Sequence, residues 1–201
     1  MRRAARRAER PPRQNPGIDR PHHPLDWTPA LDRPDLLADP VAAVLRADGS
    51  LAAEARVAAI DPDLADTASF CAAYGRSLDE SANCVVLAAK RSGETILAAC
   101  VVLATTRADV NGLARRTVGA RKASFAAMDV AVSASGMEQG GITPIGLPAA
   151  WPVLVDAAVA RAGDVVVGSG LRRSKLLVPG ALVAGLPGAT VLDALGTPAG
   201  G

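Results

Sequence analysis

A glycine-rich stretch, GGITPIGLP at 140–148, concentrates control over backbone conformation in a few residues. Gly140 and Gly141 permit positive φ angles and carry no Cβ that would block a close approach. Pro144 fixes its own φ and restricts Thr143 before it. Freedom at one end and stiffness at the other predict a loop that holds its backbone amides in one geometry. Taken alone, the stretch favours a plain turn, with a gate around a small molecule as the alternative.

A second glycine-bearing stretch, DVVVGSGLRRSK at 164–175, indicates a strand that runs into a basic loop. Backbone N–H groups and cations in such a loop suit a phosphate or a ribose edge. The residues that could provide them are Gly168, Ser169, Gly170, Arg172 and Lys175. A dinucleotide-binding fingerprint needs a third glycine where Arg173 stands, which argues against a Rossmann site. A surface turn with solvated cations is the alternative.

Several common catalytic centres are disfavoured by the residues that the sequence lacks. Both histidines, His22 and His23, lie near the N-terminus, which argues against Ser–His and Cys–His nucleophiles and histidine-bearing zinc sites in the folded part. The three cysteines lie in apolar runs without metal-type spacing, and we expect buried free thiols in a reducing cytoplasm. The acidic run at 60–66 lacks the glycine and glutamate of a calcium loop, and Asp63 is predicted to cap a helix.

Composition separates a tail from a folded domain. Hydrophobic residues make up 49% of the 201 residues, and the net charge of +2 argues against a protein that is permanently wrapped in nucleic acid. Residues 1–40 hold eight of the 15 prolines and most of the arginine excess, without helical or strand periodicity. We predict a disordered basic extension over 1–40 and one domain over 41–201. No run is long enough for a membrane span, and no secretory signal follows the first arginines.

From residue 41 onward, short helix and strand patterns alternate without strict βαβ order. Helices are predicted at 41–49, 64–75, 108–119, 128–136 and 157–163. Strands are predicted at 54–60, 83–90, 94–106, 151–156, 164–170 and 175–180, followed by a short helix and strand. This mixture predicts an α+β fold with a mixed sheet.

Four of these segments form a specific string when they are taken in order: KASFA, GGITPIGL, PVLVD and GSGLRRSKL. Over roughly residues 50–195 the chain resembles the YbaK-like family of aminoacyl-tRNA deacylases, which also supplies the editing domain of bacterial prolyl-tRNA synthetases. The resemblance implies an α+β fold with a curled mixed sheet and neither metal nor cofactor. It also implies hydrolysis of the ester that joins a small wrong amino acid, such as alanine or cysteine, to the 3′ ribose of tRNA.

The resemblance also implies roles for individual residues. The Gly-x-x-x-Pro gate of the family matches Gly140 to Pro144, with Gly141, Ile142 and Thr143 between them. Its amides would cradle the substrate carbonyl as negative charge develops on it. Asp156 occupies the acidic position of the family pattern and would hold the ribose, the amine or the water. Capping of the helix from Ala157 is the alternative for Asp156, and both roles are compatible.

One position departs from the family pattern. The family usually places a lysine at the start of the strand after the first helix, where this sequence has Asn83. We expect Asn83 to face the cavity near the Gly140 loop, and Lys90, seven residues later, to be solvated on the opposite face. Lys122 could reach the phosphates of the acceptor stem, or be an ordinary solvated lysine.

These observations lead to one principal hypothesis and two alternatives. The principal hypothesis is a trans-editing deacylase in the cytoplasm whose partner is the acceptor end of a mischarged tRNA. One alternative is a non-catalytic module that holds a tRNA 3′ end, a nucleotide or a protein, as the missing lysine at Asn83 favours. The other is an accessory domain that acts only when docked on a tRNA synthetase.

Overall fold

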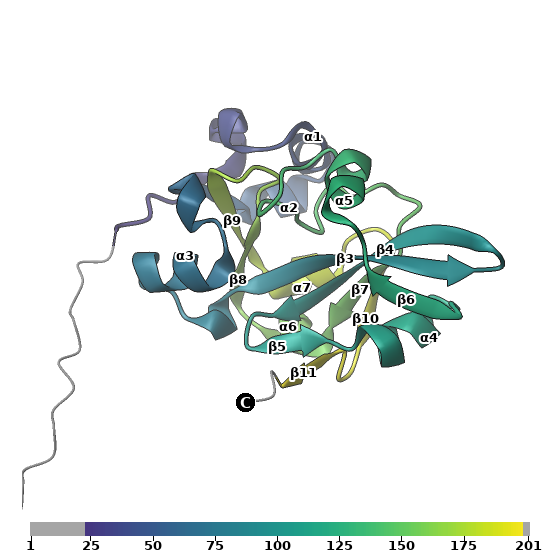
Figure 1. The fold of residues 1–201 in the computed structure, drawn as a ribbon. Helices are drawn as coiled ribbons and strands as arrows, with labels where there is room; N and C mark the ends of the chain where they lie inside the picture. The colour runs from purple at the N-terminus through teal and green to yellow at the C-terminus, as the bar shows by residue number, and fades with distance from the viewer. Residues whose placement is uncertain (1–22, 199–201) are drawn as a thin grey trace, which may run out of the picture.

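The computed structural model describes residues 23–198, which build two principal β-sheets around a shared core (Figure 1). The larger sheet has the strand order β10-β7-β4-β3-β6. Its strands are β3 (Ala82–Arg91), β4 (Glu94–Leu103), β6 (Lys122–Phe125), β7 (Val153–Asp156) and β10 (Ala189–Leu192). Strand β7 runs parallel to β4 and β10, whereas β3 pairs antiparallel with β4 and β6. The sheet is therefore mixed, as predicted.

The second sheet has the order β1-β2-β9-β8 and is antiparallel throughout. Its strands are β1 (Thr28–Pro29), β2 (Arg56–Ala59), β8 (Asp164–Gly168) and β9 (Ser174–Pro179). A bridge between Ser81 and Val166 links this sheet to the start of β3, so that the strands curl around one core. This core includes Val57, Val101 and Leu176, which come from both sheets. The α+β prediction with a curled mixed sheet is confirmed.

The longest hairpin, β3–β4, keeps an unbroken register from Ala82↔Leu103 to Arg91↔Glu94. The strands meet at the predicted turn, where Ser92 and Gly93 adopt φ angles of 51° and 90°. Paired positive φ angles are typical of two-residue hairpin turns. Because no bulge interrupts the ladder, side chains along β3 alternate between the two faces of the sheet.

Short helices cover the sheets. They are α1 (Asp39–Ala47), α2 (Gly49–Glu54), α3 (Thr67–Tyr74), α4 (Arg115–Thr117), α5 (Met128–Ser135), α6 (Ala157–Arg161) and α7 (Gly180–Ala184). A π-helical turn, Val110–Ala114, leads into α4 and replaces the regular helix predicted at 108–119. The remaining strands, β5 (Thr106–Ala108) and β11 (Gly196–Pro198), form a separate two-stranded ribbon.

Two boundaries differ from the sequence-based predictions. Gly49 does not end the first helix but begins α2, because the Asp48 side chain caps the backbone N–H groups of Ser50 and Leu51. Asp63 was predicted to cap the helix that ends at Gly75, and this prediction was wrong. The N-cap of α3 is Asp66, which accepts a hydrogen bond from Ser69 N–H at 2.9 Å. Gly75 does close α3 in the left-handed conformation, as expected.

The predicted boundary at residue 40 was also wrong. Residues 23–40 contribute β1 and two 3-10 turns, Ala30–Asp32 and Pro34–Leu36. Ala30 is fully buried, and the side chains of Leu36 and Leu37 are at most 5% exposed in the main core. The frequent prolines led to a prediction of disorder for this segment. The 3-10 turns found here tolerate proline, whereas the interior of a regular helix does not. Residues 1–22, which hold the arginine-rich part of the predicted extension, lie outside the described residues.

No helix within residues 23–198 is long and apolar enough to cross a membrane.

Candidate functional site

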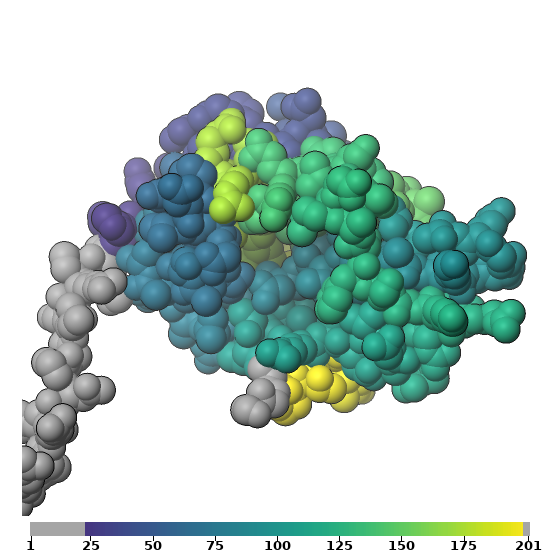
Figure 2. Space-filling view, viewed as in Figure 1, coloured from purple at the N-terminus to yellow at the C-terminus, as the bar shows by residue number. Residues whose placement is uncertain are grey.

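A cavity of about 290 Å³ opens between α3, the start of β3, strands β8 and β9, and the Gly140 loop. Figure 2 shows it as a hollow between α3 and the segment that follows α5. Its lining residues are Ala65, Asp66, Thr67, Phe70, Ser81, Ala82, Asn83, Cys84, Val85, Met128, Gly140, Ile142, Val166, Val167, Gly168 and Lys175. The walls are mostly apolar, with a few polar groups, which is typical of small-molecule sites.

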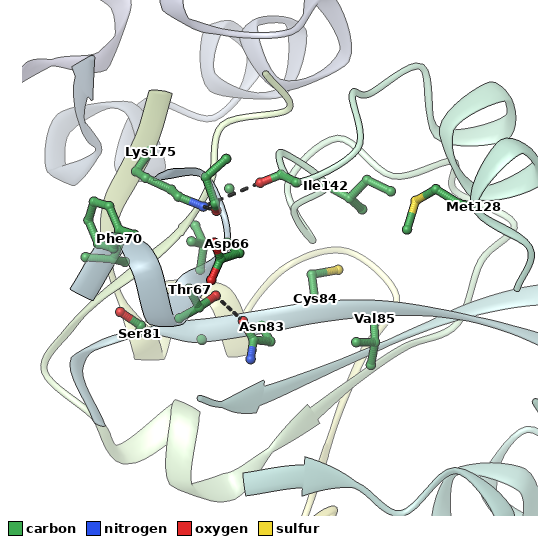
Figure 3. A pocket seen from close by; sticks show the side chains of 16 residues that line it. Asp66, Thr67, Phe70, Ser81, Asn83, Cys84, Val85, Met128, Ile142 and Lys175 are labelled. Atoms are coloured by element: carbon green, nitrogen blue, oxygen red, sulfur yellow. Dashed lines mark hydrogen bonds between the residues drawn. The ribbon is translucent and has the colours of Figure 1, made fainter. Parts of the chain in front are cut away.

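Lys175 is the cation of this cavity. It lies on β9, and only 6% of the residue is exposed. Its Nζ donates to the carbonyl oxygens of Ala65 at 2.7 Å and Gly140 at 3.4 Å, and it lies 5.6 Å from the centre of the Phe70 ring (Figure 3). Burial lowers the pKa of Lys175 to about 8, although the Asp66 carboxylate opposes this shift. The lysine was expected on a solvent-facing phosphate loop; the structure places it inside the cavity.

Asp66 and Thr67 bring polar groups to the same cavity from the N-terminus of α3. Hydrogen bonding to Ser69 lowers the pKa of the Asp66 carboxyl, and Lys175 adds a smaller electrostatic contribution. The Thr67 hydroxyl donates to Asn83 Oδ1 at 2.6 Å (Figure 3). Thus α3 is anchored to β3 through a side-chain hydrogen bond, and the amide nitrogen of Asn83 makes no hydrogen bond within residues 23–198.

The start of β3 presents two different faces to the cavity. Asn83 is among the lining residues and Lys90 is not, but the predicted orientation of Asn83 towards the Gly140 loop is not seen (Figure 3). In Figure 3 the side chain of Cys84 points towards Ile142, whereas Asn83 and Val85 point to the other side of the strand. The apolar surroundings raise the pKa of Cys84, so this residue stays a protonated thiol.

The two glycine-rich stretches predicted as separate sites form one interlocked unit. Glu138 N–H donates to Gly170 O, and Gly170 N–H donates to Gly141 O, both at 2.8 Å. The Glu138 carboxylate accepts from Arg172 N–H at 2.6 Å. A Cβ on Gly141 would lie 2.5 Å from the backbone of Leu171, so this packing requires glycine.

This interlocking decides which of the predicted loop residues reach the cavity. Gly140, Ile142 and Gly168 line it. The other predicted members, Gly141, Thr143, Pro144, Ser169, Gly170 and Arg172, are not among the lining residues. Ser169 is fully buried, and its hydroxyl lies 2.7 Å from that of Ser174. Gly141, Gly170 and Arg172 join the two segments through backbone and side-chain hydrogen bonds, whereas the buried Thr143 hydroxyl has no partner within the described residues.

Asp156 was predicted as a catalytic carboxylate, but it does not line the cavity. Its Oδ1 accepts from Ala158 N–H at 2.7 Å and caps α6, and its Oδ2 accepts from Gly196 N–H. Alternation along β7 sends Val155 to the core shared by the sheets and Asp156 to the opposite face, beside the β5–β11 ribbon. Asp156 therefore caps α6, as the alternative predicted, and its catalytic role stays a prediction without a contact to the cavity.

Lys122 belongs to a second, open hollow of about 540 Å³ at the edge of the larger sheet. Four cations line this basic hollow: Lys90, Arg115, Arg121 and Lys122. Lys90 and Lys122 are directly paired across β3 and β6. Within residues 23–198, no carboxylate approaches any of the four within salt-bridge distance. Sequence reasoning noticed Lys122 but missed its three neighbours, because the pairing of β6 with β3 could not be predicted.

Sequence reasoning also missed Asp66, Thr67 and Phe70 of the cavity. The signal was present in Asp66-Thr67, since an aspartate before a helix is a typical N-cap. Attention to Asp63, three residues earlier, misplaced the start of α3.

A comparison with known protein families finds one match, and the matched residues include the cavity. A model of the aminoacyl-tRNA editing domain matches residues 61–184, which include every lining residue of the cavity. The chain belongs to the aminoacyl-tRNA editing domain family. No curated protein sequence matches it significantly.

Solved structures share the fold of this editing domain at low sequence identity. A proposed trans-editing enzyme for prolyl tRNA synthetase superposes with a TM-score of 0.62 and 20% identity, covering 84% of this chain and 98% of the other. A scaffold protein from computational epitope grafting has a TM-score of 0.64 and 21% identity, with 78% and 95% of the two chains covered. The hypothetical protein APE2540 has a TM-score of 0.61 and 21% identity, with 69% and 89% covered. At these identities the likeness shows the fold alone.

Proposed function

We propose that this editing domain is a deacylase that acts in trans on mischarged tRNA and hydrolyses the ester of a small amino acid. The observation that carries the proposal is the cavity of about 290 Å³, which is lined on one side by the glycine loop and holds one buried lysine. Its volume is near the lower end of small-molecule pockets, which suits a small aminoacyl group.

The physical need for such a site follows from the limits of binding specificity. A synthetase pocket rejects an amino acid that lacks one methylene by only ~1–3 kcal/mol. A second cavity that admits only small acyl groups and hydrolyses them corrects the remaining errors. Here Phe70, Ile142 and Val166 form apolar walls that would limit the size of the acyl group.

The loop offers donors for the oxyanion that forms during ester hydrolysis. Gly141 N–H is already bonded to Glu138 O at 3.0 Å. The N–H groups of Gly140 and Ile142 make no hydrogen bond within residues 23–198, which leaves them available to the substrate carbonyl oxygen. Donors held in place before the reaction stabilise developing charge without reorganising.

The basic hollow supports an RNA substrate. Its four cations lie at the far end of the strand that starts at the cavity, because Lys90 and Asn83 both belong to β3. Seven residues of extended strand span ~23 Å, a distance that separates several nucleotides of an acceptor stem. Phosphates bound at Lys90 and Lys122 would leave the 3′ end free to enter the cavity.

A non-catalytic binding module is the second candidate function. It is favoured by Asn83 at the position where the resemblance implies a lysine, and by Asp156, whose carboxylate is occupied by Ala158 and Gly196. Such a module would hold a tRNA 3′ end in the same cavity without turnover.

A deacylation screen separates the two candidates. The purified chain would be incubated with tRNAs charged with alanine, cysteine, serine, proline and threonine, and release of the amino acid would be followed against buffer alone. We expect release of at least one small amino acid. Binding of these tRNAs without release above buffer for any of them would leave the binding module.

A further inference from the structure

Two hydrogen bonds occupy two of the three positions on the Nζ atom of Lys175. An ammonium has three N–H donors, whereas a neutral amine has two donors and one lone pair. Two positions of Nζ are directed to the carbonyl oxygens of Ala65 and Gly140. The third is therefore available to the cavity that Lys175 lines. In the neutral state this third position is a lone pair, which accepts a proton.

We infer that Lys175 is the general base of the proposed deacylase and removes a proton from the water that attacks the ester. The inference deepens the proposed function and rests on it. A water molecule bound at Nζ gives a proton to the amine while the water oxygen attacks the acyl carbon. The bond from this carbon to the ribose oxygen then breaks, and the protonated amine returns the proton to the ribose oxygen. The products are a free amino acid and a tRNA with its terminal hydroxyl restored.

The other titratable groups of the cavity are less suited to this role. They are Asp66 and Cys84. The pKa of Asp66 is lowered by its hydrogen bonds to the start of α3, which makes it a weak base. The pKa of Cys84 is raised by burial, so its thiol carries no negative charge to share.

The electrostatic surroundings of Lys175 are consistent with an amine that loses its proton near neutral pH. Burial lowers its pKa to about 8, Asp66 and Cys71 on the α3 side oppose this shift, and Arg172 adds to it. With such a pKa, roughly a tenth of the lysine is neutral at pH 7. General bases are most effective when their pKa lies near the working pH.

The test is a pH–rate profile of single-turnover deacylation on the tRNA that responds in the screen, corrected for spontaneous hydrolysis. For the wild-type chain we expect the rate to rise with pH and level off with a midpoint near 8. Lys175→Met and Lys175→Arg should each lower the maximal rate by about 100-fold, because neither side chain accepts a proton near neutral pH. Arg161→Met, which removes an exposed cation of α6, serves as the control and should leave rate and midpoint unchanged.

A second variant tests the base rather than the fold. Asp66→Asn keeps a capping side chain but removes the negative charge that raises the pKa of Lys175. The midpoint should therefore move to lower pH. An active wild-type chain whose profile lacks a midpoint near 8, or a Lys175→Arg variant with a rate and profile like the wild type, would overturn the inference and leave the deacylase standing. A wild-type chain that releases no amino acid would instead remove the deacylase, and the base with it.

Discussion

The cavity and the basic hollow place their lysines in opposite environments. In the cavity, Lys175 is almost fully buried, bonded to two carbonyl oxygens, and has a lowered pKa. In the basic hollow, Lys90 and Lys122 are exposed and lie beside two arginines. Burial suits a lysine for proton transfer, whereas exposure and clustering suit it for attracting phosphates. The comparison predicts that variants in the cavity change turnover and variants in the hollow change affinity.

The largest effect is expected for Gly140→Ala. Gly140 has a φ of 84°, and a Cβ there would lie 2.9 Å from the Arg172 guanidinium and 3.4 Å from Ala65. The methyl group would strain the backbone and displace the loop that supports the proposed oxyanion donors. We expect the deacylation rate to fall by about 100-fold with the fold retained, measured by single-turnover kinetics and circular dichroism. A rate near that of the wild type would show that the loop is only a turn.

The next effect concerns the basic hollow. The double variant Lys90→Gln/Lys122→Gln should raise the Kd for tRNA by more than about tenfold at low salt. The single-turnover rate at saturating enzyme should be retained. Each lost phosphate contact should also make the slope of log Kd against log salt shallower by roughly 0.7–0.9. Fluorescence anisotropy of a labelled tRNA over a salt series measures both quantities. Unchanged affinity and slope would place the RNA elsewhere on the molecule.

Asn83→Ala should have a smaller effect on turnover. The variant removes the acceptor for the Thr67 hydroxyl and the amide donor at the cavity wall. We expect about a tenfold loss in kcat/KM, which corresponds to ~1.4 kcal/mol, the scale of one lost hydrogen bond. Thr67→Val provides the matched control, because it removes the Thr67–Asn83 bond but keeps the Asn83 side chain. Equal losses in both variants would assign Asn83 to anchoring α3 rather than to the substrate.

The last prediction concerns stability and not turnover or affinity. The folded-state pKa of Lys175, about 8, lies below its ordinary value of 10.5, so folding bears the cost of the buried charge at pH 7. This cost is fully present below pH 8, falls as the pH rises, and is gone above 10.5. It amounts to on the order of 3 kcal/mol. The stability of Lys175→Met relative to the wild type should therefore fall by a similar amount between pH 7 and pH 10.5, as measured by urea unfolding. A pH-independent difference would mean that Lys175 stays charged in the native state.

The same contrast explains which features could be predicted from sequence. The hairpin was predictable because its turn residues, Ser92 and Gly93, carry a local signal. The unusual backbone conformation of the Gly140 loop was predictable, since adjacent glycines such as Gly140 and Gly141 favour positive φ angles and close packing. These features depend on residues that are close together in the chain.

The environment of Lys175 could not be predicted in the same way. Its bond to Ala65 O joins residues 110 positions apart, and the two arginines before it suggested a surface loop. Asp156 shows the same dependence on the assembled sheet, because a carboxylate at the end of a buried strand can cap a helix as readily as it can act in catalysis. Both residues were noticed by type, but their roles depend on which face of a strand they occupy in the assembled sheet.

The interlocked glycine loops also have a consequence for local opening motions. Glu138 N–H donates to Gly170 O, and Gly170 N–H donates back to Gly141 O. Neither segment can detach from its neighbour without breaking the bonds of both, although 32 positions separate Glu138 from Gly170 in the chain. The amides of Glu138 and Gly170 should therefore exchange with deuterium at a common opening free energy, as one cooperative unit.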